Sequence, residues 1–187
     1  EKFGVDGTAP EEFGVPVAPS GLGEMEDAAQ LAMSSIGQSD VRMTTLQNAM
    51  VAATVSNGGV RMEPQLIKAL TAPDLSVVEG FTPHDAGRAL TDEQAGTLTD
   101  LMIGAEAHAG GGLPGVTIAS KTGTAEHGVD SSESIPYTWY IAFVPGQDLA
   151  VAVALESGPG INRGTVGATY AAPIGREVLG ALLGGAP

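Results

Sequence analysis

The chain has 187 residues, 43% of them hydrophobic and 16% charged, which is enough to bury a sizeable core in one domain or a large piece of one. Eight Lys and Arg against 22 Asp and Glu give a formal net charge of −14, which would repel phosphates and excludes nucleic acid as an expected partner. The sequence has no cysteine for a disulfide or a thiolate zinc site and no apolar run long enough to span a membrane.

The first half of the chain predicts one helix between loop-rich stretches. Residues 1–23 are rich in Gly, Pro and acidic side chains without a clear period, which is typical of loops. Hydrophobic residues recur at helical spacing after Thr44, a capping residue, until Asn57 and two following glycines end the run. Residues 60–70 are a mixed stretch that could form a short strand. Residues 71–88 are expected to be mostly loop.

A second helix is predicted over residues 91–108. Thr91 and Gln94 have the spacing of a capping box, in which each side chain binds a backbone N–H at the helix start. Leu98 and Met102 then fall on one apolar face. Three consecutive glycines follow and predict the end of this helix.

The last third of the chain predicts three strands and a closing helix. Residues 116–124, 139–144 and 149–155 are short runs rich in β-forming residues, and the last two are expected to form a hairpin. Residues 165–183 are expected to be helical, with Pro173 near the start or at a kink. The apolar residues on one side of that helix are Ile174, Val178, Leu179 and Leu182. The expected fold class is α/β (α+β), an antiparallel sheet covered by helices.

The run Lys121–Thr124, at the end of the first predicted strand, has the residue types that could bind a peptide-like ligand with a carboxylate. A lysine there supplies fixed positive charge, and threonine hydroxyls can bind a carboxylate. The glycine lets a peptide-like ligand approach the backbone, and a following N–H could face a developing oxyanion. On these residues alone, an ordinary strand ending in a solvated lysine is the simpler interpretation.

A phosphate-binding loop is a rival interpretation of the same residues. Gly115 and the Ser120-Lys121-Thr122 run nearly match its spacing. The second glycine is replaced by Ser120, and the β-branched residues in between resist the backbone that such a loop requires. We therefore reject this interpretation.

The Lys-Thr-Gly-Thr-Ala run at 121–125 resembles the third motif of the serine penicillin-binding proteins and β-lactamases. The flanking segments resemble class B penicillin-binding proteins, which are D,D-transpeptidases, over about residues 32–176. Within this region, Ala125–Gly128 and Ala171–Arg176 look closest to the actinobacterial PbpA branch. The segments that carry the resemblance are Ser35–Gln38, Thr44–Ala49, Ala52–Gly59 with Pro64, Trp139–Pro145, Ala125–Gly128 and Ala171–Arg176.

The other two motifs of that family, Ser-x-x-Lys and Ser-x-Asn, are missing from the sequence. Gln65 stands three residues before Lys68, and Ile118 stands three residues before Lys121. Both motifs precede this region in the family, so we expect residues 1–187 to be the C-terminal portion of a transpeptidase domain, with residues 1–31 as its loop-rich opening. Such a portion should be inactive by itself. A pseudoenzyme is the less favoured explanation.

The resemblance implies an acyl-enzyme mechanism in which a serine outside this chain attacks a D-Ala-D-Ala stem peptide or a β-lactam. In that mechanism Lys121 is a catalytic and substrate-binding residue that supplies positive potential, and the hydroxyls of Thr122 and Thr124 bind the terminal carboxylate. Gly123 keeps the strand open to substrate, and the Thr124 N–H is an oxyanion donor.

Glu126 and His127 follow the motif and are candidates for lining the cleft. The simpler alternative is that both side chains are solvated in a loop and have no functional role. We expect neither a cofactor nor a metal.

The resemblance further implies partners and a location. The partners are stem peptides, β-lactams and the missing upstream half of the domain, with cell-division or elongation machinery as a further candidate. The location is the extracytoplasmic face of the bacterial membrane, with an N-terminal anchor outside this chain. Two alternatives stay open, namely a β-lactamase or D,D-carboxypeptidase of the same fold, and a non-catalytic β-lactam-sensing or interaction domain.

Overall fold

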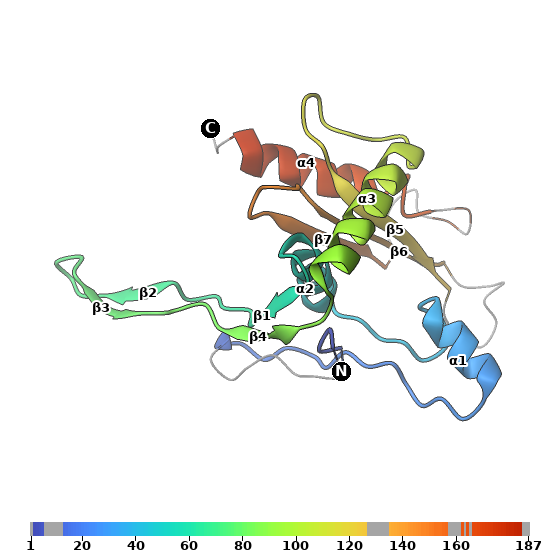
Figure 1. Cartoon of the computed structure of the whole chain (residues 1–187), viewed down its shortest axis with the longest axis horizontal. Helices are drawn as coiled ribbons and strands as arrows, with labels where there is room; N and C mark the ends of the chain where they lie inside the picture. Colours follow the sequence, from blue (N-terminus) through green and yellow to red (C-terminus); the bar gives the residue numbers. More distant parts are fainter. Residues whose placement is uncertain are drawn as a thin grey trace.

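A central antiparallel sheet organises the fold (Figure 1). It consists of β5 (Ala119–Ala125), β6 (Tyr137–Phe143) and β7 (Ala150–Leu155), hydrogen-bonded in that order. The predicted strands and the predicted hairpin between the last two are therefore confirmed. The computed structural model describes residues 2–5, 13–126, 135–156, 162, 164 and 166–184.

Helices cover both faces of this sheet, which confirms the predicted fold class (Figure 1). Successive side chains of a strand point to opposite faces. Tyr140 of β6 accordingly packs with α4 (Ala171–Gly184), whereas Phe143 packs with α2 (Thr45–Ser56) and α3 (Asp92–His108). The sheet therefore separates two buried apolar clusters, and burial of apolar area is the main force that holds these layers together.

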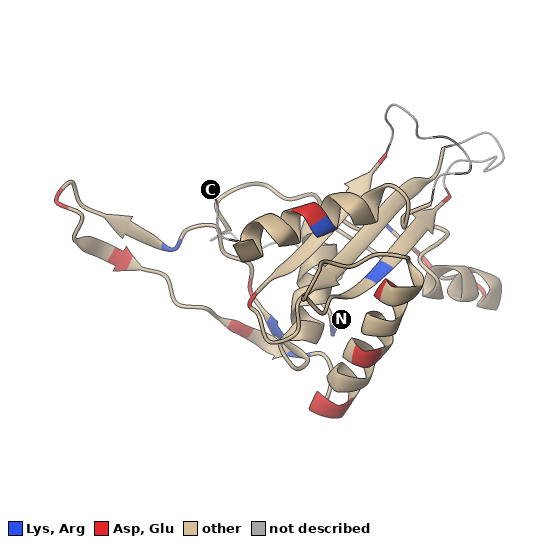
Figure 2. Cartoon of the chain, turned by 90° about the horizontal axis from the view of Figure 1, so that it is seen from above, with Lys and Arg blue, Asp and Glu red and all other residues tan. Residues whose placement is uncertain are grey.

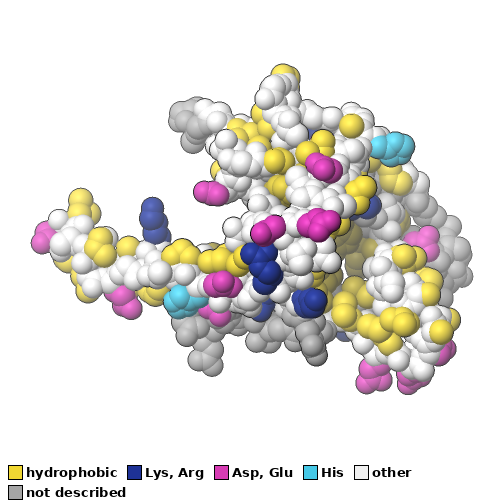
Figure 3. Space-filling view, in the orientation of Figure 1, with side chains coloured by type: hydrophobic (Ala, Val, Ile, Leu, Met, Phe, Trp, Pro, Cys, Tyr) yellow, Lys and Arg dark blue, Asp and Glu magenta, His cyan; other side chains and the backbone are white. Residues whose placement is uncertain are grey.

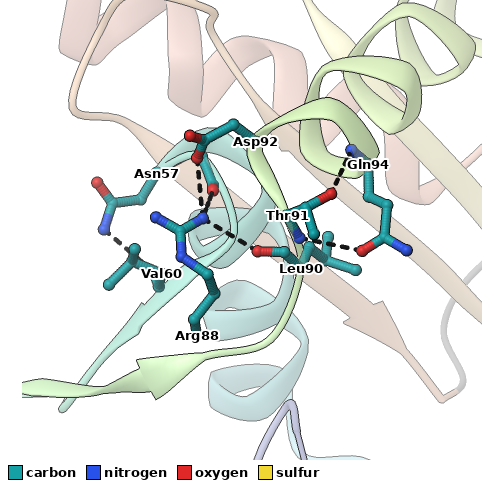
Figure 4. Close-up of polar contacts among 8 residues, drawn as sticks. Asn57, Val60, Arg88, Leu90, Thr91, Asp92 and Gln94 are labelled. Atoms are coloured by element: carbon teal, nitrogen blue, oxygen red, sulfur yellow. Dashed lines mark hydrogen bonds and ion pairs between the residues drawn. The ribbon is translucent and has the colours of Figure 1, made fainter.

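The first two predicted helices start at the expected capping residues. The Thr44 hydroxyl accepts a hydrogen bond from the Gln47 N–H at 3.0 Å, at the start of α2. At the start of α3, the Thr91 hydroxyl accepts from the Gln94 N–H at 3.2 Å, and the Gln94 side chain accepts from the Thr91 N–H at 3.0 Å (Figure 4). The predicted capping box is therefore present, and such a cap stabilises a helix by about 1 kcal/mol.

Arg88 ties the end of α2 to the start of α3 (Figure 4). Its Nη1 donates to the Gly58 carbonyl at 2.8 Å, to the Leu90 carbonyl at 3.1 Å and to Asp92 Oδ1 at 2.8 Å. One guanidinium nitrogen thus binds two backbone carbonyls near the helix ends and a carboxylate in the first turn of α3.

The prediction that residues 71–88 are mostly loop is wrong. β3 (Val77–Gly80) pairs with β2 (Ala69–Thr71), and β4 (Asp85–Arg88) pairs with β1 (Val60–Met62). These strands have three or four residues, and most of their side chains are exposed, so they lack the alternating pattern that reveals a half-buried strand. We call residues 69–80 the hairpin arm, because they project away from the sheet and its helices with hydrophobic side chains along their surface (Figures 1 and 3).

Two further differences concern the ends of the chain. A helix, α1 (Ala28–Ser35), begins within the predicted loop-rich opening and is capped by Asp27. At the other end, α4 begins at Ala171 rather than near residue 165, with Pro173 in its first turn.

The predicted apolar face of α4 is only partly correct. Leu179 is fully buried, but Ile174 and Leu182 are 41% and 56% exposed, and Val178 is exposed as well. The helix instead turns small residues toward the sheet. A Cβ at Gly175 would lie 2.4 Å from the Tyr140 ring, so only glycine allows this close approach.

The charges of the described residues are spread over several elements. Figure 2 shows acidic positions along α3 and along the hairpin arm, with few basic positions between them. This distribution fits a solvated acidic surface. Each helix in the described ranges is too short or too polar for a membrane span.

Candidate active site at the Lys-Thr-Gly strand

The Lys-Thr-Gly motif lies in the middle of β5, an outer strand of the sheet. Lys121 is opposite Ile141, and Gly123 is opposite Trp139 in the pairing with β6. Among the described strands, none pairs with the other edge of β5. An extended ligand could pair with that edge as a peptide does, although the Thr124 carbonyl on it accepts a hydrogen bond from the side chain of Gln38.

A hollow of about 860 Å³ borders this strand. Residues 121–126 line it on the side of the sheet, and residues 36–45, which connect α1 to α2, line it on the other side. Its volume falls in the range of small-molecule pockets. Lys121 is exposed at this hollow, and its Nζ donates to the Thr122 carbonyl at 2.5 Å.

Thr124 is held from two distant parts of the chain. Its hydroxyl accepts a hydrogen bond from the Gly167 N–H at 3.3 Å, and its carbonyl is 3.5 Å from the donating Nε2 of Gln38. The first contact comes from the turn before α4 and the second from the rim of the hollow. Side chain and backbone of this residue are therefore positioned separately.

Gly167 packs directly on the backbone of the sheet. A Cβ at this position would lie 2.5 Å from the carbonyl oxygens of both Gly123 and Trp139. A real side chain atom cannot approach that closely, so the turn before α4 would have to move away from β5. Only glycine places the Gly167 N–H within reach of Thr124.

A buried carboxylate lies behind the motif. Glu106, in the last turns of α3, accepts hydrogen bonds from the Ser120 hydroxyl at 2.5 Å and the Tyr140 hydroxyl at 3.0 Å, both on Oε2. Its Oε1 accepts from Arg176 Nε of α4 at 2.6 Å. The side chains of Arg176 and Glu106 are 12% and 5% exposed. We call Glu106, Ser120, Tyr140 and Arg176 the Glu106 network.

The charges of this network are set by its hydrogen bonds. Burial would raise the pKa of the Glu106 carboxyl, but the hydrogen bonds that it accepts and the positive charge of Arg176 outweigh burial, so the pKa lies below its usual value. Burial, followed by the charge of Glu106, raises the pKa of the Tyr140 hydroxyl far above its usual value. The carboxylate is therefore ionised at neutral pH, and the phenol is a neutral donor.

The structure brings the predicted substrate-binding residues, Lys121–Thr124, together on one strand beside the hollow. Glu126 follows the strand, is exposed and also lines the hollow, whereas His127 lies outside the described residues. Within the described ranges, no group of three or more His, Asp or Glu side chains could hold a metal ion.

Sequence reasoning did not find the Glu106 network, Gln38 or Gly167. A signal existed for Glu106, because it shares the buried face of α3 with the predicted core residue Met102, and a carboxylate on such a face requires partners. The sequence has no comparable signal for the hydrogen-bond partners of Glu106. Arg176 is 70 residues away in the sequence, and only the fold brings the two together.

Known proteins resemble this chain over nearly its whole length. The family model described as "Penicillin binding protein transpeptidase domain" matches residues 2–180. A protein named peptidoglycan D,D-transpeptidase PbpA, from Mycolicibacterium smegmatis, is 49% identical over 98% of this chain. The chain spans 38% of the length of that relative.

Solved structures show the same similarity. The crystal structure of PBPA from Mycobacterium tuberculosis superposes with a TM-score of 0.88 at 46% identity, over 97% of this chain and 42% of that chain. The structure of the same M. tuberculosis protein described as its penicillin G acyl-enzyme complex gives a TM-score of 0.87 at 46% identity, over 97% of this chain and 41% of that chain.

Proposed function

Because the chain belongs to the transpeptidase domain family of penicillin-binding proteins, we propose that its complete polypeptide is a peptidoglycan D,D-transpeptidase that β-lactams inhibit. The observation that carries this proposal is the position of Lys121–Thr124 on the open edge of β5 beside a hollow of about 860 Å³. The relative from M. smegmatis bears the name of this activity, and the M. tuberculosis protein forms an acyl-enzyme with penicillin G.

The proposed reaction is acyl transfer through a serine ester. The serine oxygen attacks the carbonyl of the penultimate D-Ala, the peptide C–N bond breaks, and the terminal D-Ala leaves with a proton on its nitrogen. An amine of a neighbouring stem peptide then attacks the ester and releases the serine. With a β-lactam, the ring C–N bond breaks instead and the leaving nitrogen stays attached, so the ester persists.

The motif residues have separate roles in this proposal. Lys121 supplies positive charge at the hollow, and the hydroxyls of Thr122 and Thr124 bind the substrate carboxylate. Gly123 leaves room for the substrate backbone. The Thr124 N–H is an oxyanion donor. Support for this last role comes from the 3.5 Å contact of the Thr124 carbonyl with Gln38, which places that carbonyl outside the β5–β6 ladder. In an antiparallel strand the N–H of a residue points to the same side as its carbonyl.

The nucleophilic serine belongs to a part of the polypeptide outside these 187 residues. The sequence lacks both Ser-x-x-Lys and Ser-x-Asn, and the chain spans 38% of the M. smegmatis relative. We therefore propose that residues 1–187 are the C-terminal portion of the domain, that the upstream portion faces the hollow beside Lys121, and that this portion by itself is inactive. Glu126 and His127 remain candidates for lining the cleft.

The proposed substrate also sets the location and the partners. Peptidoglycan lies outside the bacterial cytoplasmic membrane, so the working domain acts at its outer face, held by an anchor outside this chain. Stem peptides and β-lactams are the small ligands, and cell-division or elongation machinery is the candidate protein partner.

A transfer assay tests the proposed function. The full-length protein is incubated with a stem peptide ending in D-Ala-D-Ala and with a D-amino acid as the acceptor amine, and the products are separated by mass spectrometry. We expect the acceptor to be joined to the peptide with release of one D-Ala per transfer. Release of D-Ala with hydrolysis alone would instead indicate a carboxypeptidase, and no release from the folded protein would contradict the proposal.

A further inference from the structure

One buried carboxylate connects four elements of the fold. Through the hydrogen bonds of the Glu106 network, α3 is joined to β5 at Ser120, to β6 at Tyr140 and to α4 at Arg176. Burying these charged and polar groups costs free energy, and mutual hydrogen bonds offset that cost only when the geometry is good. The network therefore fixes the relative positions of these elements at the points where it touches them.

Ser120 directly precedes Lys121, so the network acts on the motif through the backbone. Side chains of adjacent strand residues point to opposite faces. Ser120 is 1% exposed and points toward Glu106, whereas Lys121 is exposed at the hollow. Fixing the Ser120 hydroxyl therefore fixes the rotation of β5 about its axis just before the motif begins.

A second hydrogen bond fixes the neighbouring strand to the same oxygen. Tyr140 lies opposite Thr122 in the β5–β6 pairing, and its hydroxyl binds Oε2 of Glu106 together with Ser120. The register of the two strands at the motif is thereby tied to one atom.

The network is packed tightly on its other side. A Cβ at Gly111 would lie 1.6 Å from Cζ of Arg176, so the guanidinium lies directly over this glycine. Cζ of Arg176 is also 5.8 Å from the centre of the Tyr140 ring. The guanidinium that holds Glu106 therefore packs between the backbone of Gly111 and the ring of Tyr140.

From these contacts we propose that Glu106 is a positioning residue for the reaction, acting through Ser120 on Lys121 and the Thr124 N–H. The inference rests on the proposed function. Among the described strands, β5 is held by β6 alone, so its orientation toward the hollow depends on groups behind it. Glu106 is not among the residues that line the hollow, but a small displacement of an oxyanion donor or of the lysine would slow acylation strongly.

The test compares Ser120→Ala with wild type in the full-length protein. This substitution removes the hydrogen bond to the strand and leaves the Glu106–Arg176 pair in place. Acylation by a fluorescent penicillin is followed at several concentrations, which separates the dissociation constant of the noncovalent complex from the first-order acylation constant. The amount of label at completion counts the competent sites, and each rate is expressed per competent site.

We expect Ser120→Ala to lower the acylation constant about 10-fold, while the dissociation constant changes by less than about 2-fold. Glu106→Gln should lower the acylation constant in the same way. The double variant should be no slower than Glu106→Gln alone, because both substitutions act on the same connection, the one between Ser120 and Glu106. The matched control is Glu177→Gln, which removes an exposed carboxylate next to Arg176 and should leave both constants unchanged.

The possible outcomes separate this inference from the proposed function. If wild type is acylated and both variants react at its rate per competent site, the positioning role is wrong and the proposed function stands. The same conclusion follows if the variants lose competent sites without a change in rate, because Glu106 would then only stabilise the fold. If folded wild type is not acylated at all, the proposed function fails and the positioning role fails with it.

Discussion

Lys121 lies on β5 with its side chain exposed, and its ammonium group is the positive charge of the Lys-Thr-Gly motif. We predict that Lys121→Ala lowers the acylation rate constant of the full-length protein by at least about 100-fold, as removal of one preorganised donor does in other acyl-transfer sites. Lys68→Ala is the matched control, because Lys68 is also exposed but lies outside the residues that line the hollow. Equal acylation of both variants and wild type would show that Lys121 has no part in the reaction.

The close packing of Gly167 on the backbone of the sheet gives a second prediction for a single residue. Gly167→Ala should lower the acylation rate about 10-fold, because the turn before α4 must move away from β5 and the Thr124 hydroxyl then loses its donor. Gly104→Ala is the control. Gly104 lies in α3 with open space at the Cβ position, so alanine there should stabilise the fold by about 0.5–1 kcal/mol. Acylation kinetics and melting temperature measure both effects, and unchanged kinetics in Gly167→Ala would refute the first.

At the scale of single residues, the motif could be predicted from the sequence, but the Glu106 network behind it could not. Lys121–Thr124 are contiguous, so their chemistry is visible in the sequence. The donors to Glu106 lie 14, 34 and 70 residues away along the chain. Neither periodicity nor composition links positions that only the folding of two helices and two strands brings together.

The cap of α3 gives a prediction about one helix. Thr91→Ala removes the hydroxyl that accepts from the Gln94 N–H, so we expect the free energy of unfolding to fall by about 1 kcal/mol. Thr97→Ala is the control inside the same helix, where the hydroxyl binds the Glu93 carbonyl and contributes little to helix stability. Thermal unfolding compares the two variants, and an equal effect of both would argue against the capping box.

The connection between α3 and α4 through Glu106 predicts a dependence of stability on pH. The pKa of Glu106 is lower in the folded state than the usual value of about 4.3, so its ionised form stabilises the fold fully above that value. This contribution is lost as the pH falls through the lowered pKa. The melting-temperature difference between wild type and Glu106→Gln should therefore be largest near neutral pH and shrink toward pH 3. Calorimetry with Glu177→Gln as the charge control tests this, and a difference that grows on acidification would contradict it.

Helices with a buried face and a capping residue could be predicted from the sequence, whereas strands with mostly exposed side chains could not. The starts of α2 and α3 follow from Thr44 and from the Thr91–Gln94 pair, which act locally. The strands of the hairpin arm are mostly exposed, so hydrophobic alternation does not mark them. The orientation of α4 was missed because Gly175 and its alanine neighbours, rather than the larger apolar residues, face the sheet.

The complete fold gives the motif a setting that no single element provides. Helices on both faces hold the sheet, while β5 stays at its edge with the hollow beside it. The chain spans 38% of the M. smegmatis relative, and the motifs that would bring a nucleophile are not in its sequence. These observations support the proposal that the chain forms one wall of an active site whose serine lies in another part of the polypeptide.

Mapping a covalent penicillin label tests this account directly. The full-length protein is treated with a fluorescent penicillin, denatured and digested, and the labelled peptide is identified by mass spectrometry, for wild type and for Lys121→Ala. We predict one labelled serine, outside residues 1–187, in a Ser-x-x-Lys sequence, with labelling that is strongly slowed in the variant. Absence of label on the folded protein, or a label on a residue within this chain, would contradict the account.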